Sequence, residues 1–347
     1  MVVWRWLRYL IGLGLAALAI YLVLGRTDEL SGASGFLDNL RWWWLAPAVA
    51  LEAGSYLSFA AMQRRLLAAG GVNAPLLTMS GVTMAGNAIQ NSLPAGIVLS
   101  AAYAFRQYRR FGADDVLSAW VVVAMGAVSL ITLSALAAAG LALAASTGSA
   151  LDLVESILGV VLIALVIVVL WAKRMFLLAR CEGMIHLSQR LVHRPAGDPH
   201  EVMREVLTRL GRVAPSKGEW FEASGYAMGN WVLDLCCLTL SFLAVGADVP
   251  WQGLLLAYTA AQLATNLPIT PGGLGVVEGS LTVALVAFGG GQVQTVSAVL
   301  LYRLMNFWAM LPVGWGSWAA LAIHARRHPE LAPGAALVPL APDEVAP

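Results

Sequence analysis

Long apolar runs separated by short polar stretches dominate the chain. A helix needs about 20 apolar residues to cross a bilayer, and runs of that length predict six spanning helices. They lie near residues 7–24, 43–62, 116–146, 153–172, 221–245 and 296–323. The first run follows a basic start like that of a secretory signal, but it is longer than the apolar part of such a signal, so we interpret it as a retained span.

Two further apolar regions, 76–105 and 252–290, are each interrupted near the middle by proline and glycine. In the second region the halves Gly253–Leu267 and Val276–Gly289 are too short to cross about 30 Å at about 1.5 Å per residue. Both regions are therefore predicted to be re-entrant helical hairpins. The fold class is an all-α polytopic membrane protein with about six spans and two hairpins.

Composition agrees with this class and excludes several others. Of the 347 residues, 59% are hydrophobic and 12% charged, whereas about a quarter are charged in soluble domains. The net charge of +1 does not favour a nucleic-acid partner. The 3 cysteines have no metal-ligand or disulfide spacing, so no metal or cofactor is expected.

Basic residues predict the orientation. With both termini in the cytoplasm, 18 of the 21 Lys and Arg residues fall on the cytoplasmic side, as the positive-inside rule requires. We expect a multi-pass protein of the cell membrane.

The same arrangement predicts an inverted repeat. Repeat one covers about 43–146 and repeat two about 221–323, and the segment Asn91–Pro94 resembles Thr265–Pro268. Inverted repeats with broken helices are typical of secondary transporters. The alternative is a chance likeness of two helix ends. The bundle would span 1–325, with a cytoplasmic connector at 173–219 and a disordered cytoplasmic tail at 326–347.

The break in the second hairpin is the most informative segment. Pro268 and Pro271 end one helix, the following glycines allow positive φ, and a new helix begins inside the membrane. Its unpaired N–H groups form a candidate anion site. The alternative is a Pro/Gly loop buried in protein.

Ionisable residues within the apolar runs are the other candidates, because charge at that depth is costly and usually paired or functional. Arg303 either forms an ion pair with Glu278 or contacts a substrate phosphate. Asp234 either carries a coupling proton or caps a neighbouring helix, and Glu52 lies in the span 43–62. The candidate substrate-binding residues are Asn87, Asn91, Pro94, Asn230, Asp234, Asn266, Thr270, Gly272, Gly273, Gly275, Glu278 and Arg303, and the candidate headgroup contacts are Arg106, Arg109 and Arg110.

The run PITPGGLGVVEG, followed some twenty residues later by LLYRL, resembles the signature of the lysylphosphatidylglycerol synthase transmembrane-region family. That family includes the flippase half of multiple peptide resistance factor. The resemblance covers roughly residues 7–325. It implies roles for Asn91 and Pro94 in a first motif, and in a second motif for Pro268, Pro271, Gly272, Gly273, Gly275, Glu278 and Arg303.

The resemblance favours a lipid translocase that moves an anionic, aminoacylated or polyprenyl-phosphate-linked lipid between leaflets. We expect no aminoacylation by this chain alone, because nothing after residue 325 has the composition of a synthase domain. Two alternatives stay open: a membrane-embedded lipid-modifying transferase, and a non-catalytic partner of a separate lipid synthase. Membrane lipids with anionic headgroups are the expected partners, and a homodimer is left open.

Overall fold

The computed structural model describes residues 40–93, 95–145, 215–265 and 271–327, and all regular structure in these ranges is helical. Within these ranges, four helical runs are long and apolar enough to cross a membrane: 42–69, 115–144, 217–244 and 292–327. The predicted all-α membrane class is therefore confirmed. The predicted spans 7–24 and 153–172, most of the connector and nearly all of the tail lie outside the described residues.

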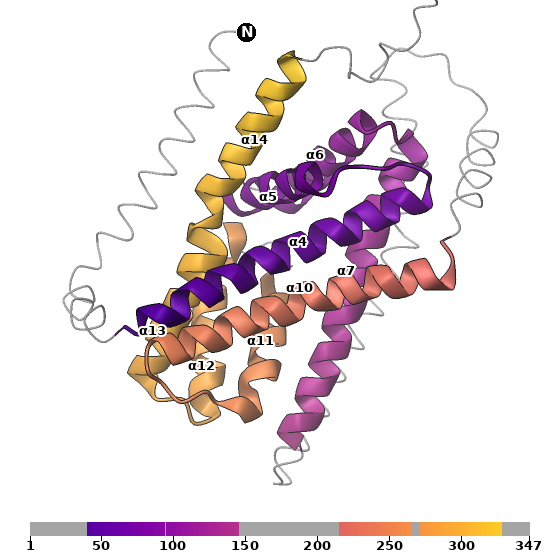
Figure 1. The fold of residues 1–347 in the computed structure, drawn as a ribbon. Coiled ribbons are helices and arrows are strands. Elements are labelled where there is room, and N and C mark those ends of the chain that lie inside the picture. Colours follow the sequence, from indigo (N-terminus) through magenta and orange to yellow (C-terminus); the bar gives the residue numbers. More distant parts are fainter. Residues whose placement is uncertain (1–39, 94, 146–214, 266–270, 328–347) are drawn as a thin grey trace, which may run out of the picture.

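The long helices coincide with predicted spans (Figure 1). Helix α10 begins with a capping box, in which the Ser216 hydroxyl accepts from the Glu219 N–H and the Glu219 carboxylate accepts from the Ser216 N–H. The last run is interrupted by one π-helical segment, η3. The bounds are α4 (Leu45–Ala69, preceded by the short turn η1, Trp42–Trp44), α7 (Asp115–Ala145), α10 (Lys217–Ala244), α13 (Gln292–Arg303), η3 (Leu304–Trp308) and α14 (Met310–Arg327).

Each interrupted region forms two short helices. The first contains α5 (Leu76–Ser92) and α6 (Gly96–Arg110), and the second contains α11 (Trp251–Thr265), the turn η2 (Pro271–Gly273) and α12 (Val276–Ala287). At about 1.5 Å per residue, each of these helices is shorter than the hydrocarbon thickness of about 30 Å. The break in each region is thus present as predicted, and the return of each hairpin to its own side stays a prediction.

Helices α4 and α10 run antiparallel, side by side, through the centre of the molecule (Figure 1). The Asn230 amide donates to the Ser55 hydroxyl at 2.6 Å, and that hydroxyl donates to the Asn230 carbonyl at 3.0 Å. Near one end of the pair, Arg65 Nε lies 2.7 Å from the Glu222 carboxylate. Polar side chains within this apolar pair are thus satisfied by the partner helix.

The two halves of the molecule pack against each other reciprocally. Helix α7, which follows the first hairpin, packs on α11 of the second hairpin, and α14, which follows the second hairpin, packs on α5 of the first. A glycine allows the close approach in each case. A Cβ on Gly140 would lie 2.9 Å from the Leu256 nitrogen, and a Cβ on Gly314 would overlap the Met84 carbonyl oxygen. The two halves therefore exchange equivalent contacts, and the inverted repeat itself stays a prediction.

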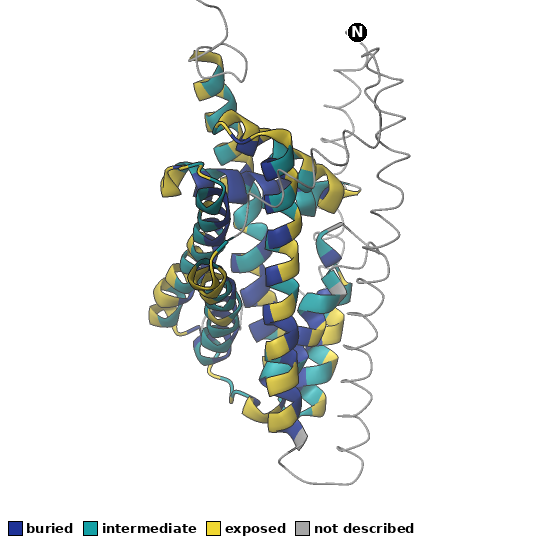
Figure 2. Cartoon of the chain, turned by 90° about the vertical axis from the view of Figure 1, so that its right-hand side faces the viewer, coloured by how far each residue is buried: buried dark blue, intermediate teal, exposed yellow. Residues whose placement is uncertain are grey.

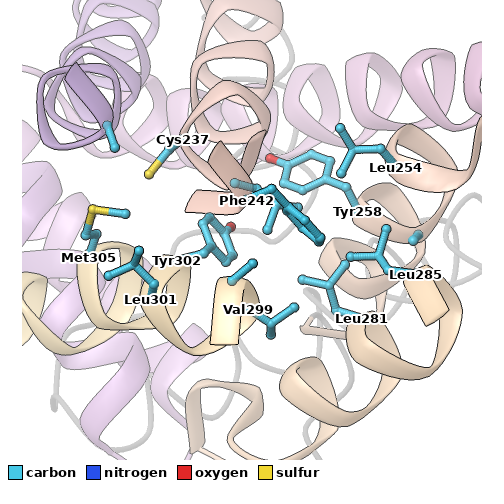
Figure 3. Packing of buried hydrophobic residues seen from close by; sticks show 14 of the residues in the cluster. Cys237, Phe242, Leu254, Tyr258, Leu281, Leu285, Val299, Leu301, Tyr302 and Met305 are labelled. Carbon is cyan, nitrogen blue, oxygen red and sulfur yellow. The ribbon is translucent and has the colours of Figure 1, made fainter. Parts of the chain in front are cut away.

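Each half also has its own hydrophobic core. The first core contains residues of α4, α5, α6 and α7, together with Ala223 and Ala227 of α10. The second core contains residues of α10, α11, α12 and α13, together with Ala48 of α4. Figure 3 shows Phe242, Leu281 and Leu285 packed in the second core. Exposed residues, many of them apolar, lie along the outer faces of the long helices (Figure 2), as expected of surfaces that contact lipid.

Substitution of Gly314 by alanine should destabilise the protein by about 1–3 kcal/mol, because the added Cβ meets the α5 backbone, which cannot move aside cheaply. Gly316→Ala on the same helix is the matched control, since a Cβ there meets nothing within 4 Å. Thermal unfolding in detergent measures both. Equal midpoints for the two variants would contradict the close approach of α14 to α5.

Cysteine accessibility tests the course of the hairpins. If each hairpin returns to its own side, Asn73→Cys and Arg110→Cys should label from one face of the membrane, and Asp248→Cys and Gln292→Cys from the other. All four positions are exposed. The parent should have Cys181, Cys236 and Cys237 replaced by alanine. Labelling of Asn73→Cys and Arg110→Cys from opposite faces would show that the first hairpin crosses fully.

Candidate functional site

The tip of the second hairpin is held by Arg303. Its Nε donates to Glu278 Oε1 at 2.7 Å, its Nη2 donates to the Gly272 carbonyl at 3.2 Å, and its guanidinium lies 4.5 Å from the centre of the Phe307 ring. Arg303 is 4% exposed. The ion pair expected of Arg303 and Glu278 is therefore present, and it ties the hairpin tip to the end of α13.

Glu278 also caps the helix that begins after the break. Its Oε2 accepts from the Gly275 N–H at 2.7 Å, while Oε1 receives Arg303. A carboxylate at this position is stabilised by the positive end of the helix dipole. In this structure, the negative charge that the start of α12 attracts is the side chain of Glu278 itself.

The tips of the two hairpins meet. A Cβ on Gly272 would lie 3.3 Å from the Asn91 carbonyl oxygen and would overlap the Phe307 ring, so only glycine fits at this contact. Gly272 also has φ of +63°, which other residues adopt only with strain. On the same end of α5, the Asn91 amide donates to Asn87 Oδ1 at 2.9 Å. The structure thus brings Asn91 to the tip of the second hairpin, with Asn87 hydrogen-bonded to it one turn earlier in α5.

Asp234 lies at the centre of a hydrogen-bond network beside this tip. Its carboxylate accepts from the Tyr258 hydroxyl at 2.7 Å, from Gln262 Nε2 at 2.7 Å, from the Tyr302 hydroxyl at 2.9 Å and from Asn306 Nδ2 at 2.9 Å. Figure 3 shows both tyrosine rings among the apolar side chains of the second core. The network joins α10, α11, α13 and η3.

Glu52 is the second carboxyl group in this network. Its Oε1 accepts from Asn306 Nδ2 at 3.0 Å, and the same nitrogen serves Asp234. Glu52 and Asp234 are 3% and 4% exposed. We call Glu52 and Asp234 the acidic pair. Asn230, in contrast, is engaged with Ser55 in the packing of α4 against α10.

The π-helical segment η3 explains how one stretch of chain serves both sites. Arg303 at the end of α13 faces the hairpin tip, and Asn306, within η3, faces the acidic pair. A π-bulge adds a residue to one turn and re-aims the side chains around it, which is why such segments are frequent at functional sites. Sequence reasoning missed Tyr258, Gln262, Tyr302 and Asn306. The available signal was that Gln262 and Asn306 are amides within largely apolar helices.

A cavity of about 580 Å³ lies between α6 and α14. It brings together the three candidate headgroup contacts of α6 and an arginine of α14 that the sequence analysis did not select. Trp318 and Tyr103 also line it. We call this the arginine pocket, after Arg106, Arg109, Arg110 and Arg326.

Three of the candidate residues lie outside the described ranges: Pro94, Asn266 and Thr270. Gly273 and Gly275 lie at the hairpin tip with φ of +67° and +79°, which gives the turn its left-handed backbone. Within the described ranges, no three His, Cys, Asp or Glu side chains gather as a metal site would require.

Comparison with known proteins finds a family model that covers most of the chain and curated relatives that match about a quarter of it. A family model described as the lysylphosphatidylglycerol synthase TM region matches residues 9–314. Among curated proteins, two UPF0104 membrane proteins of Methanothermobacter thermautotrophicus are 36% and 30% identical over 88 and 84 residues, and one of Pyrococcus horikoshii is 26% identical over 106 residues. These matches cover 25%, 24% and 30% of this chain, and 25%, 25% and 32% of those proteins.

Removal of Glu278 should cost about 3 kcal/mol, because Arg303 is left buried without its partner, and removal of Arg303 should cost less, because the Glu278 side chain is 20% exposed. The combination of Arg303→Met with Glu278→Gln should recover at least half of that loss, since glutamine still accepts from the Gly275 N–H and no unpaired charge remains. Thermal unfolding of the single and double variants measures this coupling.

The matched control is the Arg65–Glu222 pair, whose side chains are 33% and 51% exposed. Arg65→Met and Glu222→Gln should each cost under about 1 kcal/mol, as exposed pairs do. Strictly additive losses at Arg303 and Glu278 would contradict a coupled pair.

Proposed function

The chain belongs to the lysylphosphatidylglycerol synthase transmembrane-region family, and from this premise we propose that it is a membrane lipid translocase. Its substrate would be an anionic, aminoacylated or polyprenyl-phosphate-linked lipid, which it moves between leaflets of the cell membrane. The headgroup would pass through the protein while the acyl chains stay in the bilayer.

The observation that carries this proposal is the arginine pocket. Four arginines around one cavity present planar guanidinium groups, which match the geometry of phosphate oxygens, and one of them, Arg109, also pairs with Asp115 at 2.9 Å. The volume of about 580 Å³ is in the range of small-molecule sites. Trp318 adds a side chain of the kind enriched at the membrane–water interface. An anionic lipid headgroup fits this combination of charge, size and place.

The pocket connects structurally to the hairpin tips through α14. This helix contributes Trp318 and Arg326 to the pocket, and at its other end it continues from η3, where Asn306 and Phe307 lie. Along the way, Trp315 Nε1 donates to the Ser92 hydroxyl at the end of α5 at 3.2 Å. Movement of a hairpin relative to α14 would therefore change the arginine pocket and the hairpin tip together. Alternating access between broken helices requires such a linked change.

The acidic pair and the Arg303–Glu278 pair support a transport role in a second way. Buried charges in membrane helices are expensive, and in transporters they mark substrate and ion pathways. Here the Arg303–Glu278 pair holds the hairpin tip that meets Asn91 of the first hairpin, and the acidic pair is hydrogen-bonded to tyrosines of the second core. These groups would line the path of the headgroup in a conformation in which the hairpins separate.

Reconstitution tests the proposal directly. Purified protein in liposomes should speed the transbilayer movement of labelled phosphatidylglycerol well above protein-free liposomes, and should move labelled phosphatidylcholine more slowly. No acceleration for any anionic lipid would overturn the proposal. Activity that appears only with a co-purified synthase would favour the alternative of a non-catalytic partner.

Within that assay, Arg326→Gln should weaken binding and transport of the anionic lipid by about fivefold, since one well-placed arginine contributes about 1 kcal/mol of attraction. The neighbouring Arg327→Gln is the matched control, because Arg327 does not line the pocket. The loss at Arg326 should shrink as salt is raised. Equal effects of the two substitutions would show that the pocket itself does not select the headgroup.

A further inference from the structure

The acidic pair carries an inference beyond lipid recognition. Glu52 of α4 and Asp234 of α10 both accept hydrogen bonds from Asn306 Nδ2, at 3.0 and 2.9 Å, so the two accepting oxygens lie within about 6 Å of each other. Both side chains are more than nine-tenths buried. Two carboxyl groups this close in a buried site repel each other if both are ionised.

The hydrogen bonds around the two groups differ sharply. Asp234 accepts from four donors, Tyr258, Gln262, Tyr302 and Asn306, which fill the lone pairs of an ionised carboxylate. Glu52 accepts from Asn306 and lies within hydrogen-bonding range of the Cys237 thiol and of the Asp234 carboxyl group, and its buried Oε2 receives no hydrogen bond from any other described residue. If Glu52 were ionised, its Oε2 would be a buried carboxylate oxygen without a donor, next to the Asp234 anion, which is strongly unfavourable. If Glu52 is protonated, it has a hydrogen that it can donate to a neighbouring oxygen.

The surrounding groups do not neutralise a second negative charge. The titratable side chains that face the acidic pair are Tyr56 of α4, Cys237 of α10, Tyr258 of α11 and Tyr302 of α13. Arg303 is close enough to act on Tyr56 of this cluster, but its guanidinium is engaged by Glu278 and the Gly272 carbonyl. The local charge balance is therefore met when Glu52 is a neutral acid and Asp234 is the anion.

We propose that Glu52 and Asp234 together hold one exchangeable proton, and that this proton links lipid movement to the proton gradient. The second half of the statement rests on the proposed translocase function, and the first half stands on the geometry of the acidic pair. A sodium ion is the alternative ligand for two carboxylates. It is disfavoured because four donors point their hydrogens at Asp234, which leaves few free oxygens for a cation.

The pair contacts the second hairpin directly. Tyr258 and Gln262 lie on α11, the first half of that hairpin, and both donate to Asp234 Oδ2 at 2.7 Å. Asn306, which bridges the two carboxyls, lies three residues after Arg303, which holds the hairpin tip. When Glu52 loses its proton, a second negative charge lies beside Asn306. The Glu52 carboxylate then competes with Asp234 for the hydrogen bonds of the Asn306 amide. Protonation therefore biases how tightly the hairpin is held against α4 and α10.

Infrared difference spectroscopy of the purified full-length protein tests the proton site without any transport assay. A pH titration in sodium-free buffer should show one carboxylic-acid C=O band that disappears as the pH rises and that is absent from Glu52→Gln. Glu222→Gln is the matched control, since Glu222 is exposed and lies at the other end of the α4–α10 pair, and it should keep the band. A band unaffected by Glu52→Gln, or one that appears and disappears with sodium at fixed pH, would overturn the proposal.

Proteoliposomes then test the link to transport. Wild-type lipid movement should change by up to tenfold for each unit of pH difference across the membrane, because one proton is involved per cycle. Glu52→Gln should show less than a twofold response, while Glu222→Gln should respond like wild type. If the rate of lipid movement by the wild type did not depend on the pH difference, the proposed link between the proton and lipid movement would be refuted. Absence of any lipid movement would refute the translocase function and leave the infrared result to decide the proton site.

Discussion

A carboxylate inside a membrane protein has no water to accept from, so the protein must supply every donor itself. Asp234 is where this constraint is strongest, and its donors come from three different segments: Tyr258 and Gln262 of α11, Tyr302 of α13 and Asn306 of η3. These hydrogen bonds fix the second hairpin and the last long helix against α10. The second half of the molecule is therefore organised around one buried charge.

The first half has a related but uncharged arrangement. Gln63 of α4 donates to the Thr83 hydroxyl of α5 at 2.9 Å and accepts from the Tyr108 hydroxyl of α6 at 2.7 Å. This network also joins a long helix to both halves of a hairpin, without any ionisable carboxyl group. Two similar scaffolds thus carry different chemistry, with arginines gathered beside the first hairpin and carboxyl groups beside the second. The two hairpins therefore differ in the charge of the groups that lie beside them.

The continuous run α13–η3–α14 connects these regions. It contributes Arg303 to the hairpin tip, Asn306 to the acidic pair and Arg326 to the arginine pocket. In an uninterrupted α-helix, residues three apart share roughly one face. The π segment between them alters that spacing, so that Arg303 turns toward Glu278 while Asn306 turns toward Glu52. One local irregularity therefore serves two buried charged sites.

Much of this could be predicted from the sequence, because lipid imposes strict local rules. The length of apolar runs determined the helical class and the four long helical runs described, and the prolines and glycines near residues 94 and 271 determined where the hairpins break. Arg303 and Glu278 could be paired in advance, since a charge in an apolar run requires a partner and these two lie only 25 residues apart. The acidic pair could not, because its bridging Asn306 lies 254 residues from Glu52 and 72 from Asp234, and Tyr258 looks like an ordinary member of an apolar helix. Local patterns record how each helix meets lipid, whereas only the packing of α4 against α10 and η3 decides which distant polar groups meet one another.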